Sequence, residues 1–281
     1  MQLKNINNID EICVDVIMSV YNAEKTISEA IDSMLNQTHH KVRLIICNDA
    51  STDGTYSILE KYKQNYPDKI VLIENKTNKR LAYSLNKCLE FVESPYVARM
   101  DGDDISEPQR IEKQLSFMKM HPEYDVVGTG MVSFTEDNPA LQEKHPVMNP
   151  DRYTLRNQVP YHHATILAKT SMYRRLGGYT VAERTKTGQD YDMWFRFYAA
   201  GMKGANIDEP LYKVREDVNT FKRRTFQYRF NEYKTTLFGY KLLHYPMLWY
   251  IKPTLALAKG LVPPKLAFKL MKLVSKNERQ V

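Results

Sequence analysis

The stretch "VDVIMSVYNAEKTISEAIDSMLNQTHHKVRLIICNDAS" at residues 14–51 decides the fold that this sequence predicts. It begins and ends with β-branched apolar runs, each followed by turn-forming residues, which is the pattern of short buried strands. Between the two runs, apolar residues share one face of a helix: Ile27, Ala30, Ile31, Met34 and Leu35. A strand, a helix and a second strand in this order form the repeating unit of a parallel sheet covered by helices.

The same alternation continues after residue 51. We expect further helices at 53–66, 81–93, 106–120 and 190–201, and further strands at 69–75, 96–104, 124–134 and within 162–180. A Pro-containing stretch at 136–160 is interpreted as an ordered loop or a lid. The predicted fold class is therefore α/β, a Rossmann-like and mostly parallel sheet flanked by helices, which binds ligands at the carboxyl ends of its strands.

Chain length, signals and cysteines limit the possible classes of protein. With 281 residues, 43% of them apolar, the chain is long enough for one large domain or for one domain with an appendage. Its start lacks the pattern of a secretory signal, so we expect a cytoplasmic protein. Cys13, Cys47 and Cys88 are far apart in apolar surroundings, which favours reduced thiols over a disulfide framework or a zinc site.

Positive charge is concentrated toward the end of the chain. Residues 241–281 contain eight Lys and Arg against one Glu, whereas the other 240 residues carry 32 basic and 32 acidic side chains. Lys and Pro interrupt every apolar run there before it is long enough to cross a bilayer. After Pro264, separate apolar and lysine stripes favour a helix lying on an anionic membrane surface, with Trp249 and Tyr250 upstream. The alternative is a helix packed on the protein body with solvated lysines.

The acidic cluster "RMDGDD" at residues 99–104 has three competing interpretations. The first is a solvated turn, because Asp and Gly favour turns. The second, a calcium loop of the EF-hand type, is excluded because Ser106 occupies the sixth place, which requires Gly. The third is a half-site for a hard divalent cation. Asp101 and Asp103 point the same way if strand geometry persists, and a bound diphosphate would supply the other oxygen ligands.

A diphosphate ligand implies a nucleotide pocket nearby. Tyr21 and Asn22 follow the first strand and Asp49 follows the second, so all three belong to the carboxyl edge of the predicted sheet. The chain has no G-x-x-x-x-G-K motif and no complete dinucleotide fingerprint. A metal ion or basic side chains must therefore meet the phosphate charge.

Four motifs together resemble one family. They are "IMSVYN", "NDASTDGT", "ARMDGDD" and "GQDYDMWFRF", and their order and spacing over residues 12–215 are similar to those of family 2 glycosyltransferases. The resemblance implies the GT-A fold and an inverting transfer of the kind that builds bacterial surface polysaccharides. It implies a catalytic domain at 1–215, with a nucleotide-binding half at about 12–105 and an acceptor half at about 106–215. A basic, amphipathic helical extension at 216–281 would follow.

The resemblance also implies roles for single residues. The implied donor pocket, most simply for uridine, comprises Val20, Tyr21, Asn22, Asp49, Arg99, Asp101 and Gly102. Asp101 and Asp103 are the implied ligands of Mg²⁺ or Mn²⁺ on the donor diphosphate. Asp190 matches the catalytic base of the family. The residues assigned to acceptor binding are His163, Asp192 and Trp194.

Several of these assignments have structural alternatives. Asp190 and Asp192 point about 200° apart on a helix, so only one can face the pocket, and motif position favours Asp190. The alternative for Asp190 is an acid favoured by the dipole at a helix N-terminus. Trp194 is either an indole that stacks on a sugar or a core aromatic. Arg80 stands where relatives commonly have Gly, which puts donor identity and loop geometry in question.

One leading function and two alternatives result. The leading hypothesis is a metal-dependent inverting transferase that moves a sugar from a nucleotide donor to a lipid-linked oligosaccharide at the inner face of the plasma membrane. The first alternative is transfer to a polyprenyl phosphate, which needs no strong base. The second is a non-catalytic membrane-surface or nucleotide-binding protein. The zero net charge of residues 1–240 argues against nucleic acid as a partner. The sequence is compatible with a homo-oligomer.

Overall fold

A computed structural model describes residues 11–216 and 225–259 of the chain. Within these residues the strands form one nine-stranded sheet with the order β3-β2-β1-β4-β8-β6-β9-β5, and β7 pairs with β6. The strands are β1 (Val14–Val20), β2 (Val42–Asn48), β3 (Ile70–Glu74), β4 (Tyr96–Arg99), β5 (Ile105–Ser106), β6 (Val126–Phe134), β7 (Gln142–Lys144), β8 (Leu167–Lys169) and β9 (Gly204–Arg215).

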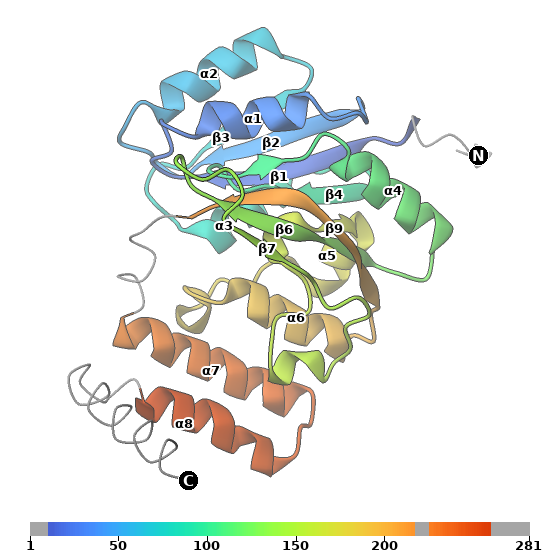
Figure 1. Cartoon of the computed structure of the whole chain (residues 1–281). Coiled ribbons are helices and arrows are strands. Elements are labelled where there is room, and N and C mark those ends of the chain that lie inside the picture. The colour runs from blue at the N-terminus through green and yellow to red at the C-terminus, as the bar shows by residue number, and fades with distance from the viewer. Residues whose placement is uncertain (1–10, 217–224, 260–281) are drawn as a thin grey trace.

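The helices alternate with the strands in the first half of the chain, and in the second half two helices precede the last strand and two follow it. They are α1 (Ile27–Leu35), α2 (Thr55–Asn65), α3 (Leu81–Leu89), α4 (Arg110–Met120), α5 (Thr170–Leu176), α6 (Gln189–Ala199), α7 (Phe226–Leu242) and α8 (Ile251–Lys259). Figure 1 shows α1 and α2 on one side of the sheet and α5 and α6 on the other. The predicted α/β architecture is confirmed.

The first half of the sheet is parallel and brings three strand ends to one edge. β1 pairs in parallel with β2 on one side and with β4 on the other, so Val14 lies between Val42 and Tyr96. Because the three strands run in the same direction, the segments that follow Val20, Asn48 and Arg99 lie at the same edge. This arrangement gathers the polar segments identified in the sequence.

The second half departs from simple alternation. β8 is antiparallel to both β4 and β6, while β9 is parallel to β6 and antiparallel to β5. Sequence patterns missed both β5 and β9. β9 is long but contains charges and Pro210, and its pairing with β6 shifts register at Gly130, so neither strict alternation nor a continuous apolar run marks it. The helix expected at 106–120 accordingly begins only at Arg110.

Two clusters of buried side chains cover the two faces of the sheet. One cluster includes Ile31 of α1 and Leu115 of α4, and the other includes Cys88 of α3, Trp194 of α6 and Tyr240 of α7. All three cysteines are free, as predicted, although Cys13 is exposed and only Cys47 and Cys88 are buried. Burial on both faces explains why the central strands are apolar without alternation.

The last described helices pack against the body of the protein. α7 lies between α6 and α8 (Figure 1). Gly239 permits the approach of α7 to α6, because a Cβ at this position would lie 2.1 Å from the Phe195 ring. No helix among the described residues combines the length and the apolar character that a membrane crossing requires. The amphipathic helix predicted after Pro264 falls outside the described residues.

Candidate active site

A buried ion pair forms the base of the site at the end of β4. Arg99 is 4% exposed, and its guanidinium donates to both carboxylate oxygens of Asp101 at 2.7 and 3.0 Å. Burial alone would lower the pKa of Arg99, but the charges of Asp101 and Asp190, among others, outweigh burial and raise it. Arg99 therefore supplies fixed positive charge to two of the predicted site carboxylates.

The three aspartates after β4 have different environments. The strand ends at Arg99, and residues 101–104 form a turn, so the assumption that strand geometry carries Asp101 and Asp103 onto one side is wrong. Asp103 is exposed, yet loss of water around its carboxylate and the charge of Asp101 raise its pKa. Asp104 is buried and accepts from the backbone N–H of Arg215 at 2.9 Å. Burial, with the charges of Asp101 and Asp103, raises its pKa to about 8.

This excess of negative charge fits a hard divalent cation. Among residues 11–216 and 225–259, no three His, Cys, Asp or Glu side chains are grouped to hold a metal ion by themselves. Asp101 and Asp103 offer oxygen ligands, and Mg²⁺ commonly completes its shell with substrate phosphates and water. Because Arg99 already occupies both oxygens of Asp101, Asp103 is the better placed of the two candidate ligands.

Asp49 organises the neighbouring loop. It is 2% exposed; Oδ1 accepts from Asn75 Nδ2 and from the Lys79 amide, both at 2.8 Å, and Oδ2 accepts from the Arg80 amide at 2.7 Å. These bonds shape the turn that leads into α3. The predicted contact of Asp49 with a nucleotide would be additional to this structural role.

The end of β1 is tied to the loop after β2. Asn22 has a left-handed backbone with φ of 51°, and its Oδ1 accepts from the Thr52 amide at 2.8 Å, which leaves its Nδ2 as the group for a ligand. Tyr21 is 49% exposed, so its ring is available for stacking. The Val20 side chain is buried against Gly102, where a Cβ would lie 3.2 Å from Val20 Cγ2. Val20 and Gly102 can therefore contribute backbone groups and the shape of the predicted donor pocket, but not polar side chains.

Asp190 lies at the start of α6 and lines a cavity of about 910 Å³. Gly188 precedes it with a φ of 81°, a left-handed conformation that glycine adopts without strain. Burial raises the pKa of Asp190, and hydrogen bonding from the Tyr191 backbone and the charge of Arg99 oppose this effect only in part. Asp190 is therefore a partly desolvated carboxylate that faces a cavity and interacts with the Arg99–Asp101 pair.

Residues of α7 and α8 form the opposite walls of this cavity. α7 contributes Tyr228, Arg229 and Tyr233, and α8 contributes Pro253, Ala256 and Leu257. Tyrosines combined with polar groups suit a saccharide, which presents both apolar faces and hydroxyls. The sequence analysis treated 216–281 only as a basic extension and so missed these residues. Their aromatic and polar character was visible, but the position of α7 beside α6 was not.

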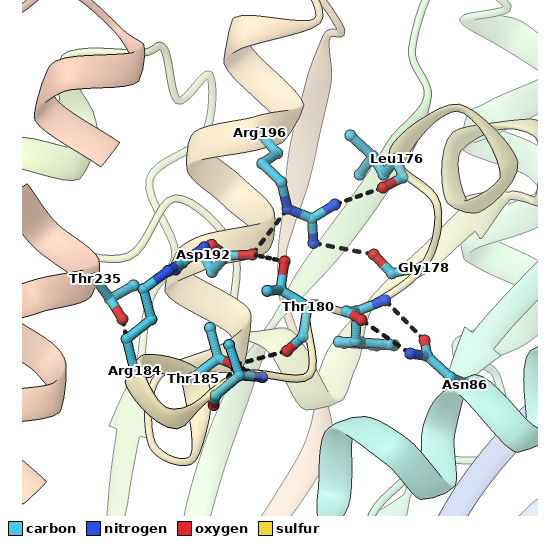
Figure 2. Close-up of polar contacts among 11 residues, drawn as sticks. Asn86, Leu176, Gly178, Thr180, Arg184, Thr185, Asp192, Arg196 and Thr235 are labelled. Atoms are coloured by element: carbon cyan, nitrogen blue, oxygen red, sulfur yellow. Dashed lines mark hydrogen bonds and ion pairs between the residues drawn. The ribbon is translucent and has the colours of Figure 1, made fainter. Parts of the chain in front are cut away.

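Asp192 does not line the cavity and is fully buried, and Figure 2 shows its carboxylate beside Thr180 and Arg196. Its carboxylate pairs with Arg184 at 2.5 Å and Arg196 at 2.8 Å and accepts from Thr180 Oγ1 at 2.6 Å. Arg196 also donates to the backbone carbonyls of Leu176 and Gly178, as Figure 2 shows. The predicted divergence of Asp190 and Asp192 is correct. The prediction that Asp192 binds acceptor is wrong, because its carboxylate is enclosed.

Trp194 and His163 also belong to the core. Trp194 is 0% exposed and packs on Tyr161 and His163, so it has no free face for a sugar, and the structure corrects that prediction. His163 is 8% exposed, and its Nε2 lies 2.9 Å from Tyr179 Oη. Burial, together with the charge of Arg99, holds the pKa of His163 well below its usual range. A neutral, packed histidine replaces the predicted acceptor ligand.

Tyr212 of β9 was also missed by the sequence analysis. Its hydroxyl accepts from the Asp101 amide at 3.1 Å, and the Arg110 guanidinium lies 5.0 Å from its ring centre. The side chain is completely buried, so its hydroxyl fixes the backbone of the acidic turn from the interior of the protein. Little in the sequence indicated this role for Tyr212, because the strand that carries it, β9, was not recognised.

Two observations place the chain in a family. The family model "Glycosyl transferase family 2" matches residues 15–177. The chain is 42% identical to "Putative glycosyltransferase EpsE" of Bacillus subtilis (strain 168), over 95% of this chain and 96% of the relative. The chain belongs to glycosyl transferase family 2. It is also 27% identical to the Escherichia coli "UDP-Glc:alpha-D-GlcNAc-diphosphoundecaprenol beta-1,3-glucosyltransferase WfaP", over 72% of this chain and 77% of that protein.

Solved structures show the same fold. TarS 1–349 of S. aureus in complex with UDP-GlcNAc aligns with a TM-score of 0.67 at 18% identity, over 89% of this chain and 71% of that chain. The mannosyltransferase PcManGT of Pyrobaculum calidifontis, in complex with GDP-Man and Mn²⁺, aligns with a TM-score of 0.60 at 19% identity, over 94% and 79% of the two chains. This member of glycosyl transferase family 2 is therefore a glycosyltransferase with a GT-A-like fold.

Proposed function

We propose that the protein is an inverting glycosyltransferase that moves a sugar from a UDP-sugar to a lipid-linked oligosaccharide. One observation carries the proposal: Asp190 lines a large cavity and interacts with the buried Arg99–Asp101 pair. A base on the acceptor side thus adjoins charged groups on the donor side. A direct displacement requires this arrangement.

The reaction needs one carboxylate base. The acceptor oxygen forms a bond to the anomeric carbon while the bond from that carbon to the donor diphosphate breaks, and the Asp190 carboxylate takes the hydroxyl proton. A divalent cation held by Asp103 and Asp101, when bound, supplies positive charge to the departing diphosphate. Arg99 fixes the orientation of Asp101 throughout.

Tyr21, Asn22 and Asp49 are the proposed contacts of the nucleotide base and ribose, supported by their gathering at the ends of β1 and β2. The names of WfaP and of the TarS complex contain a uridine diphosphate sugar, which favours UDP. The PcManGT complex holds GDP-Man, so a panel of donors should include both nucleotides.

The proposed acceptor occupies the cavity between α6, α7 and α8. The name of WfaP states a diphosphoundecaprenol-linked acceptor, which supports a lipid-linked saccharide for this chain. Such an acceptor resides in the membrane, so we expect the enzyme to act as a peripheral protein at the inner face of the plasma membrane. The basic residues of 241–281 suit the anionic lipids there.

Asp190→Asn tests the assignment of the base. We expect kcat to fall by at least about a hundredfold, because general base catalysis contributes roughly 10² to 10⁴ in rate. Binding of UDP, measured by calorimetry with Mn²⁺, should stay within about twofold of wild type, a range that allows for the charge lost beside the site. Transfer to a polyprenyl phosphate would tolerate this change, so normal turnover in the variant would favour that alternative.

The pH dependence of the wild-type enzyme provides a second test of Asp190 as the catalytic base. Its pKa is raised, so the carboxylate becomes protonated at higher pH than an exposed Asp would. Because the base must be ionised, kcat/KM should fall about tenfold per pH unit below that raised pKa. An acid limb that persists unchanged in the residual activity of Asp190→Asn would assign it to another group.

A further inference from the structure

An apolar surface on the last described helices is left open. Met247, Leu248, Ile251 and Leu255 are 88%, 77%, 54% and 56% exposed, and we call this surface the α8 ridge. Ile251 and Leu255 lie one helical turn apart on α8, and Met247 and Leu248 belong to the 3-10 turn that leads into it. Exposed apolar side chains that lie close together in this way indicate an interaction surface.

The border of the ridge is aromatic and basic. Trp249 packs edge-on against Tyr153 at 6.0 Å, and the Arg156 guanidinium lies 4.4 Å from the Trp249 ring centre. Lys252 is exposed and donates to Asn157 Oδ1 at 2.7 Å. Tryptophan and tyrosine beside basic side chains are the groups that settle at the headgroup level of a bilayer.

The segment of the chain that carries the ridge is basic. Residues 244–259 contain no Asp or Glu, and in the sequence the 22 residues after Lys259 contain four Lys and one Arg against one Glu. A protein partner would commonly require both signs at its rim, whereas an anionic lipid surface attracts an entirely basic one. Charge complementarity therefore selects the lipid surface as the occupant.

The ridge and the cavity use opposite faces of the same helix. Pro253, Ala256 and Leu257 line the cavity, while Ile251 and Leu255 point to the other side of α8. We infer that the α8 ridge docks the enzyme on an anionic bilayer, so that α8 separates the lipid from the cavity that holds Asp190. The biological role of this docking rests on the proposed function, because a lipid-linked saccharide would then enter the cavity past the edge of α8.

Vesicle binding of the full-length chain tests the ridge directly. Leu248→Ser with Ile251→Ser removes two apolar side chains that are 77% and 54% exposed. The matched control is Met120→Ser with Leu141→Ser, whose side chains are 69% and 47% exposed elsewhere on the surface. In sedimentation with phosphatidylglycerol–phosphatidylcholine vesicles, we expect the ridge variant to bind at least about tenfold more weakly than wild type. The control should bind like wild type.

Tryptophan fluorescence provides a second measurement. Trp249 borders the ridge, whereas Trp194 is fully buried in the core. Vesicles of brominated phosphatidylcholine with phosphatidylglycerol should quench wild-type emission, and Trp249→Phe should remove that quenching. Quenching that persists in Trp249→Phe, or a ridge variant that binds vesicles as tightly as wild type, overturns the inference.

Other occupants of the ridge give different results. If a further part of this chain covers it, the ridge variant loses thermal stability but keeps its vesicle affinity. If a second copy covers it, wild type is dimeric in light scattering without lipid and the variant is monomeric. Either result overturns lipid docking. Hydrolysis of the donor in the absence of lipid should be equal in wild type and ridge variant. If wild type shows no donor hydrolysis, that result counts against the proposed function. Vesicle binding would still test lipid docking by the α8 ridge separately.

Discussion

At the scale of single residues, Arg80 is the most unusual position of the site. Its φ of 71° and ψ of 168° lie in a region that essentially only glycine adopts, at a cost of about 1 to 3 kcal/mol. The Asp49 carboxylate enforces this conformation by binding the Arg80 amide at 2.7 Å. The sequence flagged Arg80 as a departure from the family pattern, and the structure shows that the departure strains the backbone.

Replacing Arg80 with Gly should stabilise the protein. We expect the free energy of unfolding to rise by about 1 kcal/mol, because relief of backbone strain exceeds the entropy that glycine adds to the unfolded chain. Arg80→Ala is the control, since it removes the same exposed side chain but keeps the Cβ. Urea denaturation measures both variants, and a glycine variant no more stable than the alanine variant would show that the strain is absent.

Residue-level predictions succeeded where a motif fixes a backbone position and failed where burial decides. The sequence placed Asp190, Arg99 and the acidic turn correctly at the strand and helix ends. It could not show that Trp194 and Asp192 turn inward, because helical spacing gives the angle between side chains but not which side of the helix meets the core. Asp192 is an example. Helical spacing predicted that it diverges from Asp190, but not that Arg184 and Arg196 pair with its carboxylate in the interior.

At the scale of elements, the Asp192 network ties the segment before α6 to the helix itself. Arg184 and Arg196 both pair with Asp192, and Thr235 of α7 donates to the Arg184 carbonyl at 2.8 Å. The segment 178–188 that these bonds hold ends at Gly188, immediately before the helix that carries Asp190. Asp192 is therefore a positioning residue, which acts on the base through the helix.

Asp192→Asn should cost both stability and turnover. We expect a loss of about 3 kcal/mol in the free energy of unfolding, because removing one partner leaves buried charge uncompensated. We also expect kcat to fall at least about tenfold per folded molecule, because small displacements of a catalytic group are costly.

Asp15→Asn is the matched control for this network. Asp15 is also 0% exposed and pairs with Arg43 at 2.8 Å, but it lies on β1 near the edge of the sheet opposite to the site. It should lose comparable stability while kcat per folded molecule stays unchanged. Equal kcat values in the two variants, measured well below their unfolding temperatures, would reduce Asp192 to a purely structural role.

Elements were predictable in the first half of the chain and less so in the second. Helices α1 to α3 and strands β1 to β4 follow from period and turn signals, because each is short, uniform and separated by polar turns. β9 and the cavity walls on α7 depend on tertiary pairing, with a register shift at Gly130 and a close approach at Gly239. Local patterns carry no information about such contacts.

At the scale of the whole molecule, the fold gathers three like charges at one edge of the sheet and sets the buried guanidinium of Arg99 beside them. Among the described residues, Arg99, Arg110 and Arg215 lie near Asp101, Asp103 and Asp104, yet burial and the mutual repulsion of the carboxylates still raise the pKa values of Asp103 and Asp104. A ligand that brings a divalent cation should therefore stabilise the folded state, whereas UDP alone adds negative charge to the same edge.

Thermal unfolding should show this dependence as a synergy. At a concentration about a hundred times its Kd, UDP with Mn²⁺ stabilises by about 2.7 kcal/mol, which corresponds to a rise in Tm of about 5 °C for a chain of this size. Either component alone should give a much smaller shift, and Asp103→Asn should remove the difference between UDP with Mn²⁺ and UDP alone. A full shift with UDP in the presence of a chelator would mean that Arg99 and its neighbours, rather than a cation, neutralise the diphosphate.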